Sequence, residues 1–170
     1  MSNQYLDFIH SRRSFRQFTE QQPTDEQIEN MLRAACSAPS SRAIYPCHFI
    51  VIKSRKTMLE LRKVHEKAIA LDTAPLTIIV CGEPALSELA WRDDCAAASM
   101  NILYAAHAQG LGACWHGIFP REYRMTPISA ILKLPENIVP YSLITIGYAI
   151  KEKKPQLRYD QSKMHMDGCW

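Results

Sequence analysis

The chain has 170 residues, of which 47% are hydrophobic and 22% are charged. These proportions are those of an ordinary globular protein, and they exclude a disordered tail, a collagen-like repeat and a heptad coiled coil. The formal net charge of +3 is too small to indicate nucleic-acid binding. We expect one globular domain over residues 1–170, with residues 151–170 as a basic C-terminal tail.

The cysteines and the N-terminal residues point to a reducing compartment. Six cysteines are scattered along the chain, and no apolar signal segment precedes them. We therefore expect free thiols in the cytoplasm rather than disulfides. No cysteine or histidine pair has the spacing of a four-ligand metal site, so no metal is expected. The uncharged stretch 95–120 is broken by Gly110 and Gly112, and we interpret it as buried in protein rather than in a membrane.

The first half of the chain combines helix signals with one strand. Thr24 and Gln27 have the spacing of a capping box, and Pro39 stops the helix that they begin. Other elements are expected as a short helix over 3–12, a strand around 49–52 and an amphipathic helix over 55–70.

The second half begins with an apolar run at 76–80 that is typical of a strand buried on both faces. After a loop at 82–92, Asp93 or Asp94 is expected to cap a long helix that ends near Gln109. Further elements are expected as strands at 113–116 and 141–148 and a helix at 126–133.

Helices and strands follow one another without strict alternation, which favours an α+β fold. The long helix is apolar on almost every side after Cys95, as buried helices are. A domain of this size rarely encloses such a helix alone, so we expect a second subunit to cover it in a homodimer. The tail contains Met164, Met166 and Trp170, and it is expected to lie on that partner.

The strongest chemical motif is Arg12-Arg13-Ser14-Phe15-Arg16. Guanidinium groups bind phosphate oxygens in pairs and stabilise negative charge on planar heterocycles. The alternative is a solvated basic stretch.

Two further motifs are weaker when taken alone. Pro39, Ser40 and Ser41 offer hydroxyls to a phosphate or ribose, although such a stretch is also typical of a turn. The glycines of Gly110-Leu111-Gly112 permit close approach of a ligand, but they do not match a dinucleotide-binding fingerprint.

The order of these motifs resembles the FMN-dependent nitroreductase family over essentially the whole chain. The resemblance rests on Arg-Arg-Ser-x-Arg-x-Phe, on Ala-Pro-Ser, and on Ala-Pro before an apolar strand. It continues with an Ala-rich helix containing Asn101, Gly-Leu-Gly-x-Cys-Trp, Gly147-Tyr148 and a terminal Trp.

The resemblance implies a three-layer α/β/α sandwich with a mixed central sheet, in an intertwined homodimer whose tails embrace the partner. It implies FMN bound at the dimer interface and reduced by NADH or NADPH. Electrons would pass to a nitroaromatic, a quinone or a similar planar acceptor by a ping-pong mechanism. The flavin would supply the chemistry, so no catalytic side chain is expected.

Site residues follow from the resemblance position by position. FMN-binding positions are Arg12, Arg13, Ser14, Arg16, Pro39, Ser40, Ser41, Trp115, His116, Gly117 and Arg158, with Lys153 or Lys154 as alternatives to Arg158. The resemblance implies that the Pro39–Ser41 stretch binds FMN from the other subunit and that the stretch from Trp115 runs beside the flavin ring. Aromatic candidates for the acceptor pocket are Tyr45, Trp91, Trp115 and Phe119. His116 is a candidate proton donor to the acceptor, the alternative being a histidine that simply fills the strand.

The chain departs from the family pattern after Ala-Pro-Ser, where Ala43, Tyr45 and Cys47 stand in place of the usual Asn, Gln and Trp. The missing amides leave the substrate class open. Two alternatives therefore remain: an FMN carrier or sensor without efficient turnover, and a module without flavin whose arginines dock an acidic partner.

Overall fold

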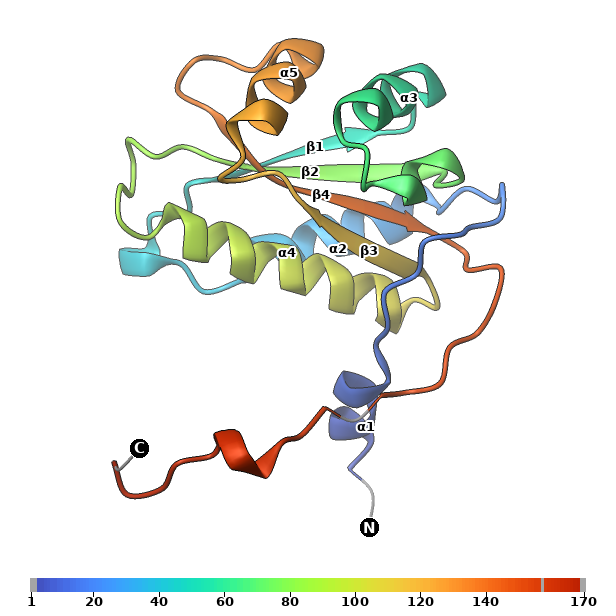
Figure 1. Ribbon diagram of the computed structural model, residues 1–170, viewed down its shortest axis with the longest axis vertical. Helices are drawn as coiled ribbons and strands as arrows, with labels where there is room; N and C mark the ends of the chain where they lie inside the picture. Colours follow the sequence, from blue (N-terminus) through green and yellow to red (C-terminus); the bar gives the residue numbers. More distant parts are fainter. Residues whose placement is uncertain (1–2, 157, 169–170) are drawn as a thin grey trace.

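A computed structural model describes residues 3–156 and 158–168, and its strands form one twisted sheet between two layers of helices (Figure 1). The strands are β1 (Cys47–Ile52), β2 (Leu76–Gly82), β3 (Gly112–Gly117) and β4 (Val139–Gly147). Their order in the sheet is β1-β2-β4-β3, and each neighbouring pair is antiparallel. The predicted buried strand at 76–80 is confirmed, because every residue of β2 is buried.

The α+β sandwich is confirmed, whereas the expected mixed pairing is almost absent from the described residues. There, one isolated bridge between Ser14 and Ala113 is the only parallel pairing. It forms because the segment after the first helix runs extended along the outer edge of β3. The named strands themselves are all antiparallel.

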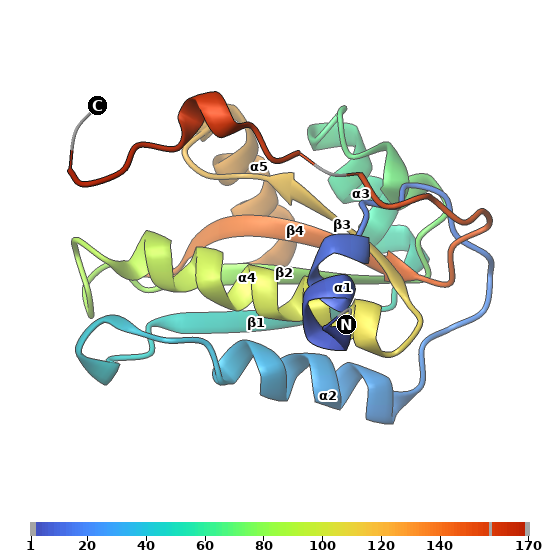
Figure 2. The same cartoon turned by 90° about the horizontal axis from the view of Figure 1, so that it is seen from below.

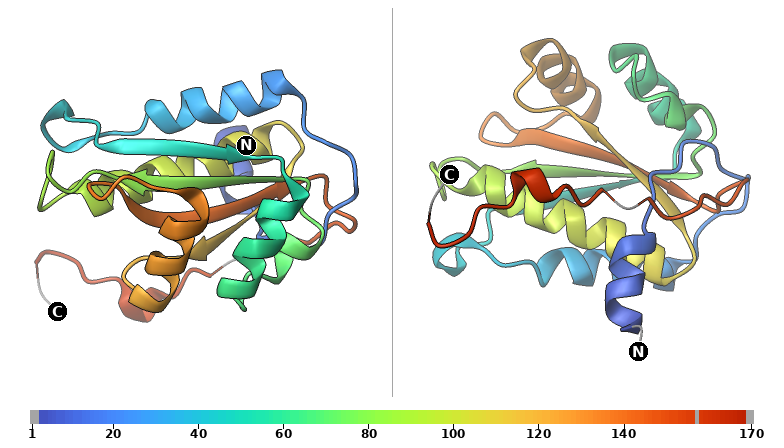
Figure 3. Two further views of the ribbon diagram at one scale, coloured as in Figure 1. Left: turned by 90° about the horizontal axis from the view of Figure 1, so that it is seen from above. Right: turned by 60° about the horizontal axis from the view of Figure 1, so that its bottom comes forward.

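Helices cover both faces of the sheet (Figures 1 and 3). The helices α2 (Asp25–Cys36) and α4 (Trp91–Ala108) lie on one face, and α3 (Arg55–Val64) and α5 (Glu122–Leu132) lie on the other. Side chains along β2 point alternately to the two faces of the sheet, which explains the two cores. Ile78 and Val80 pack toward α2 and α4, while Ile79 packs toward α3 and α5.

The caps of two helices confirm what the sequence predicts. Thr24 Oγ1 accepts a hydrogen bond from the Gln27 amide, and the Gln27 side chain accepts one from the Thr24 amide. The end of α4 is followed by Gly110, whose φ of +74° turns the chain into β3.

Three helix boundaries differ from the predictions. The prediction that Asp93 or Asp94 caps α4 is wrong, because α4 begins at Trp91 and its N-cap, Ala90, has no side-chain hydrogen bond. The helix α3 ends at Val64, where the backbone turns and buries the ring of His65. The helix α5 begins four residues before the predicted start.

The N-terminal helix α1 (Gln4–Ser11) and the tail stand away from the sheet and pass beside each other (Figures 1 and 2). No residue of α1 is buried, and Tyr5 is 71% exposed. In the tail, Tyr159 and Met166 are also exposed. The predicted contact of Trp170 lies outside the described residues. No described helix has the length and apolar character to cross a membrane.

Candidate functional site

The arginine motif lies in an extended segment that the backbone fixes against the sheet. The Phe15 amide donates to the Ala113 carbonyl at 3.0 Å, and the Thr19 amide donates to the Tyr148 carbonyl at 2.8 Å. Phe18 is buried between these contacts and anchors the segment. The arginines before it are therefore held at the edge of β3.

The tail returns to the same segment and adds further positive charge. Lys153 Nζ donates to the Ser14 carbonyl at 2.7 Å and lies over the ring of Phe15. In the other direction, Arg13 Nη1 donates to the Lys154 carbonyl at 2.7 Å. These bonds join the two ends of the chain, which are more than a hundred residues apart in the sequence.

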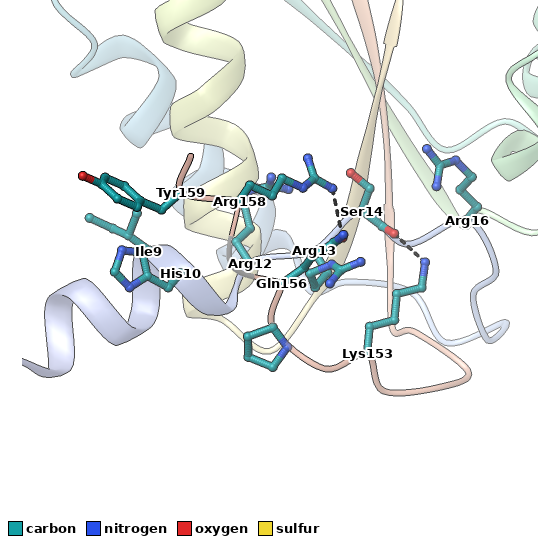
Figure 4. Close-up of a pocket in the computed structure, with 11 residues that line it drawn as sticks. Ile9, His10, Arg12, Arg13, Ser14, Arg16, Lys153, Gln156, Arg158 and Tyr159 are labelled. Carbon is teal, nitrogen blue, oxygen red and sulfur yellow. Dashed lines mark hydrogen bonds between the residues drawn. The ribbon is translucent and has the colours of Figure 1, made fainter. Parts of the chain in front are cut away.

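A cavity of about 620 Å³, which we call the basic cavity, lies between the arginine segment and the tail (Figure 4). Its described lining includes five cationic side chains and no acidic one: Arg12, Arg13, Arg16, Lys153 and Arg158. Figure 4 shows Arg12, Arg13 and Arg158 close together, with Arg16 at the far side beyond Ser14 and Lys153. The prediction that these arginines form one site thus has a geometric basis.

None of these five cations forms an ion pair within the described part of the chain. The side chains of Arg12 and Arg16 make neither a hydrogen bond nor an ion pair there, although Arg12 is half-buried. Burial and the nearby charge of Arg12 lower the pKa of His107. The cavity is therefore a region of uncompensated positive potential, which is suited to an anion with several oxygens.

The Pro39–Ser40–Ser41 stretch lies apart from the basic cavity and is organised by Asp94. The Asp94 carboxylate, buried at 6% exposure, accepts from Ser40 Oγ at 2.8 Å and from the Ser41 amide at 3.0 Å. Ser40 Oγ in turn accepts from the Tyr45 amide at 2.8 Å. The hydroxyl of Ser40 is thus used within the loop, and it is the Ser41 side chain that remains exposed.

Replacing Asp94 by Ala is expected to lower the free energy of unfolding by about 2 kcal/mol, because a buried carboxylate that accepts two hydrogen bonds is lost. The loop also contains Arg42 and Tyr45 at positive φ, so it depends on such bonds for its shape. Chemical denaturation measures the change. Asp93→Ala is the matched control, since Asp93 lies in the same helical turn but is exposed. Equal losses in both variants would show that only charge at the helix terminus matters.

Three of the four predicted aromatic residues gather around one that was not predicted, Tyr141. Trp91 and Phe119 meet edge to face with ring centroids 5.0 Å apart. Tyr141 lies 6.0 Å from Trp115 and 6.1 Å from Phe119. Tyr45 does not join them; it is 60% exposed and lines a separate small cavity.

His116 is not among the residues that line the basic cavity. Its ring is buried, Nε2 lies 3.2 Å from Thr145 Oγ1, and the ring meets that of His65 edge to face. Burial, followed by the nearby His65, Arg16 and Arg124, lowers its pKa to about 4. The histidine is therefore neutral at pH 7 and sits among core residues.

Asp94 and Tyr141 are the residues of these groups that the sequence analysis missed as contributors. Lys153 was not missed, since it is one of the two lysines named as alternatives to Arg158. Asp94 had only an expected role as a helix cap. Tyr141 had none beyond its place in an apolar strand, because its neighbours come from three other segments.

Comparison with known proteins places this geometry in a family. The model of the nitroreductase family matches residues 9–79 and 63–148. The chain belongs to the nitroreductase family. A protein of Archaeoglobus fulgidus, provisionally named as an NADH dehydrogenase/NAD(P)H nitroreductase, is 38% identical over 168 residues, covering 95% of this chain and 97% of the relative.

Solved structures of other nitroreductase-family proteins agree in fold over almost the whole chain. A Parabacteroides distasonis protein with the same provisional name is 34% identical, with a TM-score of 0.96 over 99% of this chain and 100% of its own. An FMN-dependent nitroreductase from Clostridium difficile is 29% identical, with a TM-score of 0.91 over 96% of this chain and 99% of its own. The predicted resemblance to the nitroreductase family is confirmed.

Proposed function

We propose that the chain is an FMN-dependent oxidoreductase that takes electrons from NADH or NADPH and passes them to a planar acceptor such as a quinone or nitroaromatic. The observation that carries the proposal is the basic cavity, in which Arg12 and Arg16 have no partner among the described residues. Support also comes from the Clostridium difficile relative, which is FMN-dependent by name.

The residues of the basic cavity fit the phosphate of FMN. A phosphate monoester carries nearly two negative charges and three terminal oxygens, which match a group of guanidinium donors. We assign phosphate binding to Arg12, Arg13 and Arg158, which lie together in Figure 4. Ser14 lies in the same lining, within the reach of a ribityl chain that leads away from them.

The remaining assignments are those that the resemblance to the family implies, and the direction of β3 supports them. Ser14 pairs with Ala113, so the arginine segment lies beside the start of that strand, and residues 115–117 continue it. We propose that this backbone lies beside the flavin ring. Arg16, on the far side of the cavity, would place positive charge at an anionic edge of the ring. Bound FMN supplies hydride and electron transfer, so the protein needs to bind, orient and shield it.

A second copy of the chain would complete the site. Pro39, Ser40 and Ser41 do not line the basic cavity. We propose that they contact the FMN of the partner subunit, as the resemblance to the family implies. Exposed Tyr5, Leu6 and Ile9 on α1 and Met166 in the tail supply apolar surface for such a homodimer. Each chain would then form a single domain over residues 1–170, and its tail over 151–170 would wrap the partner.

The acceptor would be planar because aromatic side chains supply the apolar surface nearby. We propose that Trp91 and Phe119, whose rings meet, contribute to the acceptor pocket, and that Tyr45 contributes from the separate small cavity beside the Ser40 loop. We assign no proton-donating role to His116, since its ring is buried. The cytoplasm suits this function, because the described cysteines are free thiols.

Steady-state oxidation of NADH and NADPH by the FMN-loaded protein, with a quinone as acceptor, tests the proposal. Double-reciprocal plots at several quinone concentrations should be parallel, because both substrates use one pocket in turn. Tight FMN binding without quinone-dependent turnover would instead support the carrier function, which the missing Asn and Gln at Ala43 and Tyr45 favour.

A further inference from the structure

Two thiols from distant parts of the chain meet between the sheet and α4. Cys47 Sγ, on the first residue of β1, lies 3.6 Å from Cys95 Sγ, in the second turn of α4. A disulfide bond is about 2 Å long, so the sulfur atoms need to approach by roughly 1.5 Å. Rotation about the Cα–Cβ bonds covers a distance of that order.

The two cysteines come together because a glycine, Gly82, lies beside them and leaves room for α4. Cys47 pairs across the sheet with Gly82, so both face α4. A Cβ atom on Gly82 would lie 3.0 Å from Cys95 Sγ and would overlap the ring of Trp91. Glycine at this position therefore permits α4 to approach the sheet closely enough for Cys95 to reach Cys47.

The two thiols differ in access and in acidity. Cys47 is partly exposed and lines a cavity of about 220 Å³ together with Pro39 and Tyr45. Cys95 is fully buried behind it. The hydrogen bond with Cys95 lowers the pKa of Cys47, although burial and Asp94 act against this. The same bond and burial raise the pKa of Cys95. Cys47 is thus the thiol that meets a reagent first.

We propose that Cys47 and Cys95 form a reversible dithiol–disulfide site that reacts with small-molecule disulfides. The Cys47 thiolate attacks one sulfur of the reagent, forming a mixed disulfide and releasing one thiolate. Cys95 then loses its proton and attacks Cys47 Sγ, which displaces the second thiolate. Two electrons pass from the protein to the reagent, and the two thiol protons end on the two released thiols.

Closing this bond would tie the start of β1 to α4 next to Asp94, which holds the loop containing Ser40. The small cavity would also become narrower, because Cys47 lines it. The oxidation state of these two thiols can be measured whether or not FMN binds.

The test is to equilibrate the purified full-length protein with glutathione disulfide and reduced glutathione at several ratios, trap free thiols by alkylation, and map peptides by mass spectrometry. We expect a loss of two hydrogen masses and a cross-linked peptide pair containing Cys47 and Cys95, reversed by excess reduced glutathione. Full alkylation of both cysteines at every ratio would overturn the proposal. A mixed disulfide that remains on Cys47 would also overturn it, since Cys95 would then not reach.

Two variants serve as matched controls. Cys36→Ala removes the other thiol that lines the small cavity, and Cys81→Ala removes a buried thiol in the core on the opposite face of the sheet. Both should keep the cross-link, whereas Cys47→Ala and Cys95→Ala should lose it. If Cys95→Ala does not fold, the peptide map of the unaltered chain still decides. If the cross-link disappears in Cys36→Ala, the bond involves Cys36 and the proposal is wrong.

Discussion

Replacing Arg12 by Gln is expected to weaken FMN binding by about 10- to 100-fold, because each charge-assisted hydrogen bond to a phosphate contributes roughly 1.5–3 kcal/mol. Arg12 is half-buried and has no hydrogen-bond or ion-pair partner among the described residues, so a bound anion meets an unshared guanidinium. Titration of the apoprotein with FMN, followed by flavin fluorescence, gives the dissociation constant. The affinity lost should shrink at higher salt, since the interaction is between charges.

Arg33→Gln is the matched control for this change. Arg33 is exposed on α2, pairs with Glu29 at 2.6 Å and is not part of the cavity. Its replacement removes one positive charge from the chain without touching the basic cavity, so FMN affinity should be almost unchanged. If both variants bind FMN as the unaltered chain does, the basic cavity is not the phosphate site.

The free energy of unfolding is expected to fall by about 3 kcal/mol between pH 6.5 and pH 4 through His116 alone. Burial, followed by His65, Arg16 and Arg124, lowers the pKa of His116 from 6.5 to about 4 in the folded chain. Below pH 6.5 the unfolded chain therefore binds a proton that the folded chain does not, which favours unfolding. The pKa of His65 is lowered by burial and Arg124, so it acts in the same direction.

Denaturation by urea at several pH values measures the slope of the free energy of unfolding against pH. His116→Gln should flatten it between pH 6.5 and pH 4, whereas His10→Gln, which changes an exposed histidine on α1, should leave it as it is. The two variants have the same chemical change, so the difference between them isolates burial. An unaltered slope in His116→Gln would mean that His116 is charged in the folded protein.

The elements predicted well are those whose signals are local. The apolar run of β2, the capping box of α2 and the glycine after α4 are short-range patterns, and each is present where the sequence indicates. The arginine motif is also local, since Arg12, Arg13 and Arg16 come from one extended segment. The sequence alone therefore identified most of the cationic lining of the basic cavity.

What the sequence did not predict depends on contacts between distant segments. Asp94 stands where a helix cap would be expected, yet its carboxylate turns to a loop more than fifty residues earlier. That loop holds Arg42, Ala43 and Tyr45 at positive φ. None of them is a glycine, the residue that would have indicated such a backbone from the sequence. His116 lies next to Trp115 on β3, but alternation along the strand turns its ring into the opposite core.

We expect this chain to bind FMN and to reduce it with a nicotinamide cofactor. The most direct measurement is the visible absorption spectrum of the full-length protein loaded with FMN, recorded without oxygen before and after NADH or NADPH is added. We predict that the bands of oxidised flavin bleach and return when a quinone is supplied. If the protein retains no FMN from an excess of it, or if its flavin bands do not change on addition of either nicotinamide, the chain is not an FMN-dependent reductase.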